Sequence, residues 1–138
     1  MAISAYLLEN VALFQGIDRK HLARLARDFQ EVVYEPGDTV VAEGSRGTGF
    51  FVIETGTAVV SVRGKEVGRL HDGQYFGEIA VLDDGPRSAT ITAVTRLVCD
   101  RIESWPFRAF VQREPDVLWK LLQTMAARLR IAERKLSA

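Results

Sequence analysis

Short strand-like segments separated by glycines run from Phe29 to Ile102, and this pattern constrains the fold more than any other feature. Many short strands at near-regular spacing, with turn-forming residues between them, are typical of antiparallel barrels and jelly rolls. The expected strands are residues 29–34, 39–42, 50–54, 57–63, 66–70, 89–95 and 97–102, with a hairpin turn at 63–65. The sequence therefore predicts a mainly β fold, an antiparallel β-roll over residues 29–103.

Helical spacing flanks this region on both sides. Ile3, Leu7, Leu8 and Val11 predict a helix over residues 3–14, and Asp18 is the expected N-cap of a second helix over 19–28. On the far side, Ser104 is the expected N-cap of a short helix that carries Pro106 in its first turn. We expect one domain over residues 1–138: a helical lead-in at 1–28, the roll, and C-terminal helices at 104–138.

The last helix is expected to run from residues 114–116 to about Leu136. Its apolar positions follow steps of four and three, which is the spacing of a heptad seam: Leu118, Leu122, Met125, Leu129, Ala132 and Leu136. The seam could pack on the roll, cap a ligand, or pair with a second copy of the chain as a homodimer. Arg128, Arg130, Arg134 and Lys135 are interpreted as a solvated helix face, because Glu133 lies among them and the net charge is zero.

The loop over residues 73–90 has the chemistry of an anion-binding cradle. Gly73 and Gly77 permit a tight turn, and residues 78–82 are long enough for one helical turn with free N–H groups at its start. Residues 83–86 then stop the turn, and Arg87 follows. Glu78 and Arg87 would suit a ligand that carries a hydroxyl at one end and a phosphate at the other, as a cyclic nucleotide does.

Phe76, Gly77, Glu78, Ile79 and Ala80, followed by Pro86, Arg87, Ser88 and Ala89, resemble the phosphate-binding cassette of cyclic nucleotide-binding domains. That family includes catabolite-activator-type regulators, regulatory subunits of cAMP-dependent kinases, and cyclic nucleotide-gated channels. Residues 12–25 and 44–60 are similar to the helical lead-in and the β-roll of the same family, so the resemblance covers nearly the whole chain.

The resemblance implies a role for each matching residue. Glu78 would hold the ribose 2′-OH and Arg87 the cyclic phosphate, with further contacts from Gly77, Ile79, Ala80, Ser88 and Ala89. Val60, Val67 and Leu70 would form an apolar slot for the purine, although plain core positions explain them equally well. Arg128 and Leu129 are the expected lid residues on the last helix.

The ligand is expected to be cAMP, with cGMP left open. In this family a threonine after the cassette arginine tends to accompany cGMP, whereas an alanine or serine accompanies cAMP, and this chain has Ser88. Bacterial activators place hydroxyl residues late in the last helix against the adenine, but this chain has Ala132 and Glu133 there. No helix-turn-helix pattern follows the last helix, so we expect no direct DNA binding by this chain.

Composition argues against several other classes. The chain has 18 basic residues (lysine and arginine) and 18 acidic residues (aspartate and glutamate), so its net charge is zero. The lack of a basic excess disfavours a general nucleic-acid or membrane-surface binder. No apolar run approaches the roughly 20 residues of a membrane span, and no signal-peptide pattern is present. The lone Cys99 fits a reducing compartment, so a cytoplasmic location is expected.

Catalysis finds little support, and we expect no enzyme, no metal and no cofactor. Two histidines in the chain can hardly supply a metal-dependent hydrolase. His71, Asp72, Asp83 and Asp84 are explained more simply by turn chemistry than by a metal site. A haem ligand at His71 or Cys99 would leave Glu78 and Arg87 unexplained.

The expected function is a regulatory sensor module that binds a cyclic nucleotide and relays binding through its last helix. One alternative is a degenerate β-roll that binds no nucleotide and serves as a protein-interaction module. Another is the effector domain of a bacterial transcription regulator, separated from its DNA-binding part. Because degenerate domains typically lose the cassette glutamate or arginine, the presence of Glu78 and Arg87 favours binding.

Overall fold

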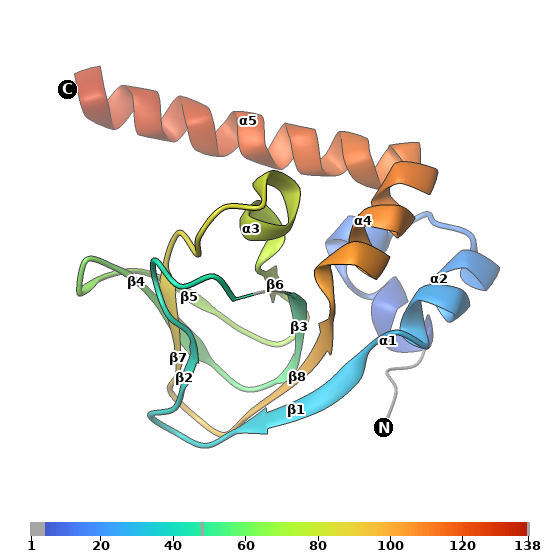
Figure 1. The fold of residues 1–138 in the computed structure, drawn as a ribbon, viewed down its shortest axis with the longest axis horizontal. Coiled ribbons are helices and arrows are strands. Elements are labelled where there is room, and N and C mark those ends of the chain that lie inside the picture. The colour runs from blue at the N-terminus through green and yellow to red at the C-terminus, as the bar shows by residue number, and fades with distance from the viewer. Residues whose placement is uncertain (1–4, 48, 138) are drawn as a thin grey trace.

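Two four-stranded antiparallel sheets pack face to face in the computed structural model, which describes residues 5–47 and 49–137 (Figure 1). One sheet has the order β1-β8-β3-β6 and the other β2-β7-β4-β5. The strands are β1 (Gln30–Tyr34), β2 (Thr39–Val41), β3 (Phe50–Thr55), β4 (Ala58–Val62), β5 (Lys65–Leu70), β6 (Tyr75–Phe76), β7 (Thr90–Ala93) and β8 (Leu97–Ile102). The helices are α1 (Ala5–Glu9), the 3₁₀ helix η1 (Ala12–Phe14), α2 (Arg19–Ala26), α3 (Glu78–Asp83), α4 (Ser104–Arg113) and α5 (Pro115–Ser137). The predicted β-roll with flanking helices is confirmed.

Strand β3 is buried on both of its faces and so joins two cores. Phe51 and Ile53 point between the sheets, into a cluster that also contains Cys99 of β8. Phe50 and Val52 point to the other face, where they pack beneath the helices. This division follows from the two-residue period of a strand, and it explains why the sequence of β3 is almost continuously apolar.

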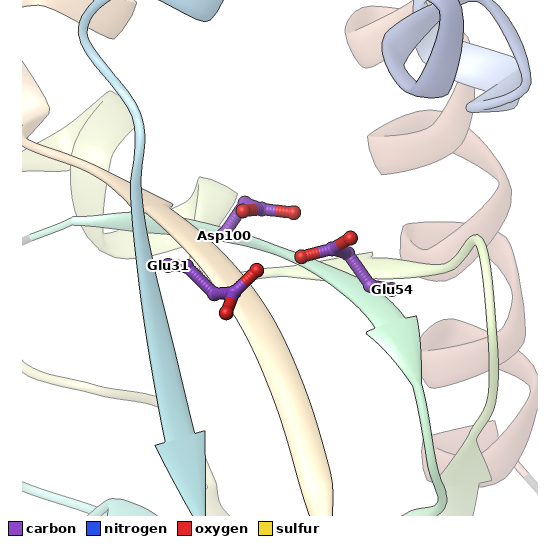
Figure 2. A group of neighbouring side chains, drawn as sticks. All are labelled: Glu31, Glu54 and Asp100. Atoms are coloured by element: carbon purple, nitrogen blue, oxygen red, sulfur yellow. The ribbon is translucent and has the colours of Figure 1, made fainter. Parts of the chain in front are cut away.

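Strand β8 lies between β1 and β3 and carries the buried Asp100. Figure 2 shows that Asp100 lies beside Glu31 of β1 and Glu54 of β3, so three neighbouring strands bring three carboxylates together. The sequence pattern did not predict this group, because the three residues meet only through strand pairing.

The prediction of one continuous helix over residues 3–14 is wrong, because two shorter helices occupy this range. Helix α1 ends at Glu9 and the 3₁₀ helix η1 begins at Ala12, while Ile3 lies outside the described residues. Leu8, Val11 and Phe14 are all buried and recur every three residues. A 3₁₀ turn has three residues and keeps such positions on one side, so packing favours it here over an α-helix. The predicted N-cap at Asp18 is confirmed, because its carboxylate accepts a hydrogen bond from Lys20 N at 2.8 Å.

The prediction that Ser104 caps helix α4 is wrong. Glu103 is the N-cap residue, and it makes no side-chain capping bond. Ser104 is the first helical residue, and its hydroxyl accepts a hydrogen bond from the backbone N–H of Gly49 at 3.1 Å instead. The hydroxyl therefore ties the start of α4 to the start of β3, a contact that local sequence cannot reveal.

Helix α5 begins and ends close to the predicted positions and extends across the domain above α3 (Figure 1). Val117 and Leu121 are the buried residues that pack it onto the helical core. Leu118, Leu122 and Leu129, at predicted heptad positions, instead face solvent. These three residues therefore do not pack on the roll, which was one of the possibilities for this seam. Within the described ranges, no helix is long and apolar enough to cross a membrane.

Candidate functional site

A cavity of about 180 Å³ lies between the second sheet and the loop that contains α3. It brings together most of the residues predicted to bind ligand: Gly77, Glu78, Ile79, Ala80, Arg87, Ser88, Ala89, Val60, Leu70 and Arg128. Val41, Tyr75, Phe76 and Ile91 line it as well and were not predicted. Alternation along β2 and β7 could have indicated Val41 and Ile91, but only strand pairing shows which face turns toward the loop. The two residues of β6 are too few to show alternation.

Gly77 shapes the turn that leads into α3. Its φ of 96° lies in the left-handed region that favours glycine, and it is the residue before the first turn of the helix. A Cβ at this position would lie 2.6 Å from the carbonyl oxygen of Gly49 and 2.9 Å from Nη1 of Arg87. A side chain would therefore both strain the backbone and displace the arginine.

Arg87 is the buried cation of the cavity, with only 4% of its surface exposed. Its guanidinium donates to the carbonyl oxygens of Gly77 at 3.3 Å and Gly49 at 3.0 Å. Its Nε has no hydrogen-bond partner, and among the described residues Arg87 forms no ion pair with a carboxylate. Burial, followed by the positive charge of Arg101, lowers the pKa of Arg87. A buried cation without a counter-charge is unfavourable, so this position suits an anion.

Glu78 is the buried anion of the cavity. Its carboxylate pairs with Arg128 of α5 at 2.8 Å, and the side chains of the two residues are 3% and 51% exposed. The pair places helix α5 at the mouth of the cavity. Arg128, predicted as a lid residue, thus lies at the site in the structure.

Two predicted site residues do not line the cavity. Val67 is 60% exposed on β5. The β4–β5 ladder pairs Val60 with Gly68 and then Ser61 with Glu66, so Val67 is the extra residue of a β-bulge. Leu129 is 61% exposed on α5, because Arg128 before it takes the inward direction and adjacent helical residues point about 100° apart.

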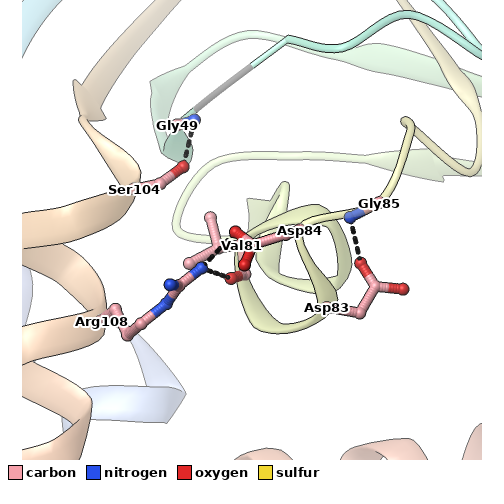
Figure 3. Close-up of polar contacts among 7 residues, drawn as sticks. All are labelled: Gly49, Val81, Asp83, Asp84, Gly85, Ser104 and Arg108. Atoms are coloured by element: carbon pink, nitrogen blue, oxygen red, sulfur yellow. Dashed lines mark hydrogen bonds and ion pairs between the residues drawn. The ribbon is translucent and has the colours of Figure 1, made fainter.

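The far end of α3 is bound to helix α4. Arg108 donates to the carbonyl oxygen of Val81 at 2.7 Å and to the Asp84 carboxylate (Figure 3). Asp84 has a left-handed φ of 56°, and the neighbouring Asp83 accepts a hydrogen bond from Gly85 N at 2.8 Å. These contacts fix the loop after α3 and connect it mechanically to α4.

The residues weighed as metal ligands near the loop take part in turns. Asp72 accepts a hydrogen bond from Gly56 N at 2.8 Å, and His71 Nδ1 lies 3.2 Å from the hydroxyl of Thr57. Cys99 is buried between the sheets, and burial together with the charges of Asp100 and Glu54 raises the pKa of its thiol to about 12. Such a thiol resists ionisation and has the character of a structural residue.

The family model described as "Cyclic nucleotide-binding domain" matches residues 31–114, which include both sheets and the loop with Glu78 and Arg87. The chain belongs to this family. The cavity of this cyclic nucleotide-binding domain is lined by residues of the 76–89 segment, which resembles the family's phosphate-binding cassette.

Individual relatives agree with this assignment. The cAMP-dependent protein kinase regulatory subunit of Mucor circinelloides f. lusitanicus is 33% identical over 82% of this chain and 27% of its own length. The catabolite activator protein of Thermus thermophilus superposes with a TM-score of 0.80 at 27% identity, covering 91% of this chain and 61% of that one. The regulatory domain of Toxoplasma gondii PKA, solved with cAMP, gives a TM-score of 0.79 at 25% identity over 90% and 48% of the two chains. This cyclic nucleotide-binding domain spans about a quarter of the kinase regulatory subunit.

Proposed function

We propose that this domain is a regulatory module that binds cAMP in the cavity between the second sheet and α3. The observation that carries the proposal is the buried Arg87, which faces the cavity without an ion-pair partner among the described residues. A cyclic phosphate would supply the missing negative charge through charge-assisted hydrogen bonds. Ile79 and Ala80 at the start of α3 line the same cavity. The first N–H groups of a helix have no partner within the helix, so they would add donors for the phosphate.

Glu78 is proposed to accept the ribose 2′-OH. Its carboxylate has Arg128 on one oxygen, Oε1, so the other remains for a ligand hydroxyl. The purine would pack against the apolar wall formed by Val60 and Leu70, with Val41 and Ile91 beside them. Ser88 favours cAMP, and cGMP is the second ligand to test.

Helix α5 is proposed to act as the lid and the output element. The cavity of about 180 Å³ is smaller than the roughly 300–1,000 Å³ of most small-molecule sites, so we expect a nucleotide to move α5 when it enters. Because Arg128 joins α5 to the carboxylate that would hold the ribose, ligand binding and helix position are coupled. The ligand shifts this equilibrium only as far as it binds one helix position better than the other.

The exposed apolar residues of α5 support a further proposal, a homodimer. Leu118, Leu122 and Leu129 are solvent-exposed at heptad spacing, and a second α5 would cover them. We also propose a cytoplasmic, non-catalytic role, which the family's binding function and the single buried thiol of Cys99 support.

Calorimetric titration with cAMP and, separately, cGMP tests the proposal. The purified domain is first checked for co-purified nucleotide by its absorbance ratio and by mass spectrometry after denaturation. We expect a Kd of micromolar or tighter for cAMP and weaker binding of cGMP. If demonstrably empty protein gives neither heat nor a shift in Tm with either nucleotide, the proposal fails and the non-binding interaction module takes its place.

A further inference from the structure

The carboxylates of Glu31, Glu54 and Asp100 form a second cluster, away from the nucleotide cavity. One oxygen of each lies within 4.8 Å of the others, and none of the three residues lines the cavity (Figure 2). Glu31 is exposed, Glu54 is half-buried and Asp100 is fully buried, so the cluster runs from solvent into the sheet.

Strand pairing creates this cluster. Glu31 lies directly opposite Asp100 in the β1–β8 ladder. On the other side, Asp100 lies opposite Val52, and the β3–β8 register shifts between Ile53 and Thr55, so Glu54 occupies a β-bulge. Because Glu54 is two residues after Val52, it shares the face of the sheet to which Val52 and Asp100 point, and strand pairing thus brings a third carboxylate to the other two. Like charges directly opposite each other destabilise a sheet, so the arrangement is unfavourable unless a cation or a proton neutralises it.

Asp100 supplies an independent indication that something binds here. It is 0% exposed, and neither of its carboxylate oxygens has a hydrogen-bond donor. Among the residues that the structure describes, no lysine, arginine or histidine side chain forms an ion pair with any of the three carboxylates. Buried carboxylate oxygens are normally satisfied by hydrogen bonds or by a cation.

We propose that Glu31, Glu54 and Asp100 bind a hard divalent cation such as Mg²⁺ or Ca²⁺. An all-carboxylate set is the ligand chemistry of these ions. Calcium–oxygen distances of about 2.3–2.6 Å allow opposite ligands to lie nearly 5 Å apart, which accommodates the observed spacing. The exposed side chain of Glu31 leaves an entry path and room for water ligands. The ion would join β1, β8 and β3 and so stabilise the first sheet.

The competing explanation is a proton held between the carboxyls of Asp100 and Glu54. The two explanations differ in what neutralises the cluster, so they predict different responses to metal. This inference does not rest on nucleotide binding, because the cluster lies outside the cavity and its test uses no nucleotide.

Chelator-treated protein is heated at pH 7.5 with MgCl₂, CaCl₂ or MnCl₂ added separately, and its Tm is recorded. We expect at least one ion to raise the Tm saturably by about 3 °C or more, with half-saturation below roughly 1 mM. Asp100→Asn should abolish this response, and Glu31→Gln should weaken it at least several-fold. Glu35→Gln, which neutralises an exposed carboxylate just after β1, is the matched control and should respond as the wild type does.

Mn²⁺ also locates the ion, because it broadens nearby amide signals in a ¹H–¹⁵N spectrum. We expect loss of the signals of Glu31, Glu54 and Asp100 while those of Gly77 to Ala80 persist. The proposal is overturned if none of the three ions changes the Tm, if Asp100→Asn responds as strongly as the wild type, or if broadening centres elsewhere. If Asp100→Asn fails to fold, the exposed Glu31→Gln variant serves as the test. A rise in Tm with metal equal to that of the wild type would then reject the site.

Discussion

Arg128 of helix α5 donates a hydrogen bond to the carboxylate of Glu78 at 2.8 Å, which links the C-terminal helix directly to the cavity. Glu78 is buried, whereas Arg128 is half-exposed, and both side chains line the cavity. The same carboxylate is the proposed partner of the ribose. One residue therefore connects ligand binding with the position of the helix.

We expect cAMP to slow hydrogen exchange across residues 118–136, because α5 in its ligand-bound position would pack over the nucleotide. Arg128→Gln should reduce this ligand-dependent protection and should also lower the free energy of unfolding, because the buried Glu78 carboxylate loses its charged partner. Arg130→Gln, an exposed arginine on the same helix, is the control and should retain the protection. Equal exchange rates with and without cAMP in the wild type would contradict a lid role.

Substitution of Arg87 should weaken cAMP binding strongly. Arg87→Ala leaves the phosphate without its counter-charge, and we expect a loss of about 2–5 kcal/mol, or roughly 30-fold or more in Kd. Because Arg87 also bonds the carbonyl oxygens of Gly49 and Gly77, Arg87→Lys provides a second variant that keeps the positive charge. Arg69→Ala, at an exposed position on β5, is the control and should bind normally. Titration calorimetry measures all four proteins, and an unchanged Kd in Arg87→Ala would reject the cassette assignment.

Gly77→Ala should destabilise the domain more than Gly37→Ala does. Both glycines have a positive φ, 96° and 91°, so both alanines carry a similar backbone cost of roughly 1–2 kcal/mol. At Gly77 the added methyl also meets the carbonyl oxygen of Gly49 and the guanidinium of Arg87, whereas at Gly37 it meets nothing within 4 Å. Urea denaturation measures the difference, and nucleotide titration should show lost affinity only for Gly77→Ala. Equal stabilities for the two variants would mean that the loop relaxes around the methyl group.

The free energy of unfolding should fall as the pH rises from about 5 to about 8 in the presence of chelator. Burial, followed by contact with Glu54 and the charge of Glu31, raises the pKa of Asp100 from 3.8 to about 8. The folded protein therefore holds a proton that the unfolded chain has released in this range, so raising the pH favours unfolding. Asp100→Asn should flatten this dependence, as measured by urea denaturation at several pH values. Identical pH slopes in the two proteins would show that Asp100 titrates normally.

Self-association should depend on the exposed face of α5. We expect the wild type to sediment as a dimer at tens of micromolar, and Leu122→Glu to sediment as a monomer, because a charge on a heptad position would be buried between two helices. Val94→Glu places the same charge on an exposed apolar residue outside α5 and should leave the dimer intact. A wild-type protein that stays monomeric at about 100 µM would reject the dimer.

Local chemistry made much of the fold predictable from the sequence. The two-residue alternation and the glycine turns located seven of the strands, as the hairpin at Arg63 and Gly64 illustrates, because both residues adopt the positive φ that the tight turn needs. The short strand β6 was missed, since a pair such as Tyr75 and Phe76 is too brief to show a period. The chemistry of the loop from Gly77 to Arg87 was predictable for the same local reason. A glycine turn, a carboxylate and an arginine have the same conformational and charge properties wherever the loop lies in the fold.

Tertiary structure alone decided which side chains meet. The pairing of β4 with β5 left Val67 exposed outside the cavity, and the pairing of β8 with β1 and β3 brought Glu31 and Glu54 beside Asp100. The rotation of α5 selected Arg128 over Leu129 for contact with Glu78. Backbone preferences and periodicity are properties of neighbouring residues, so the sequence by itself determined the elements and the chemistry of the loop. Strand register and helix rotation depend on the partner element across the core, and only the folded chain fixes them.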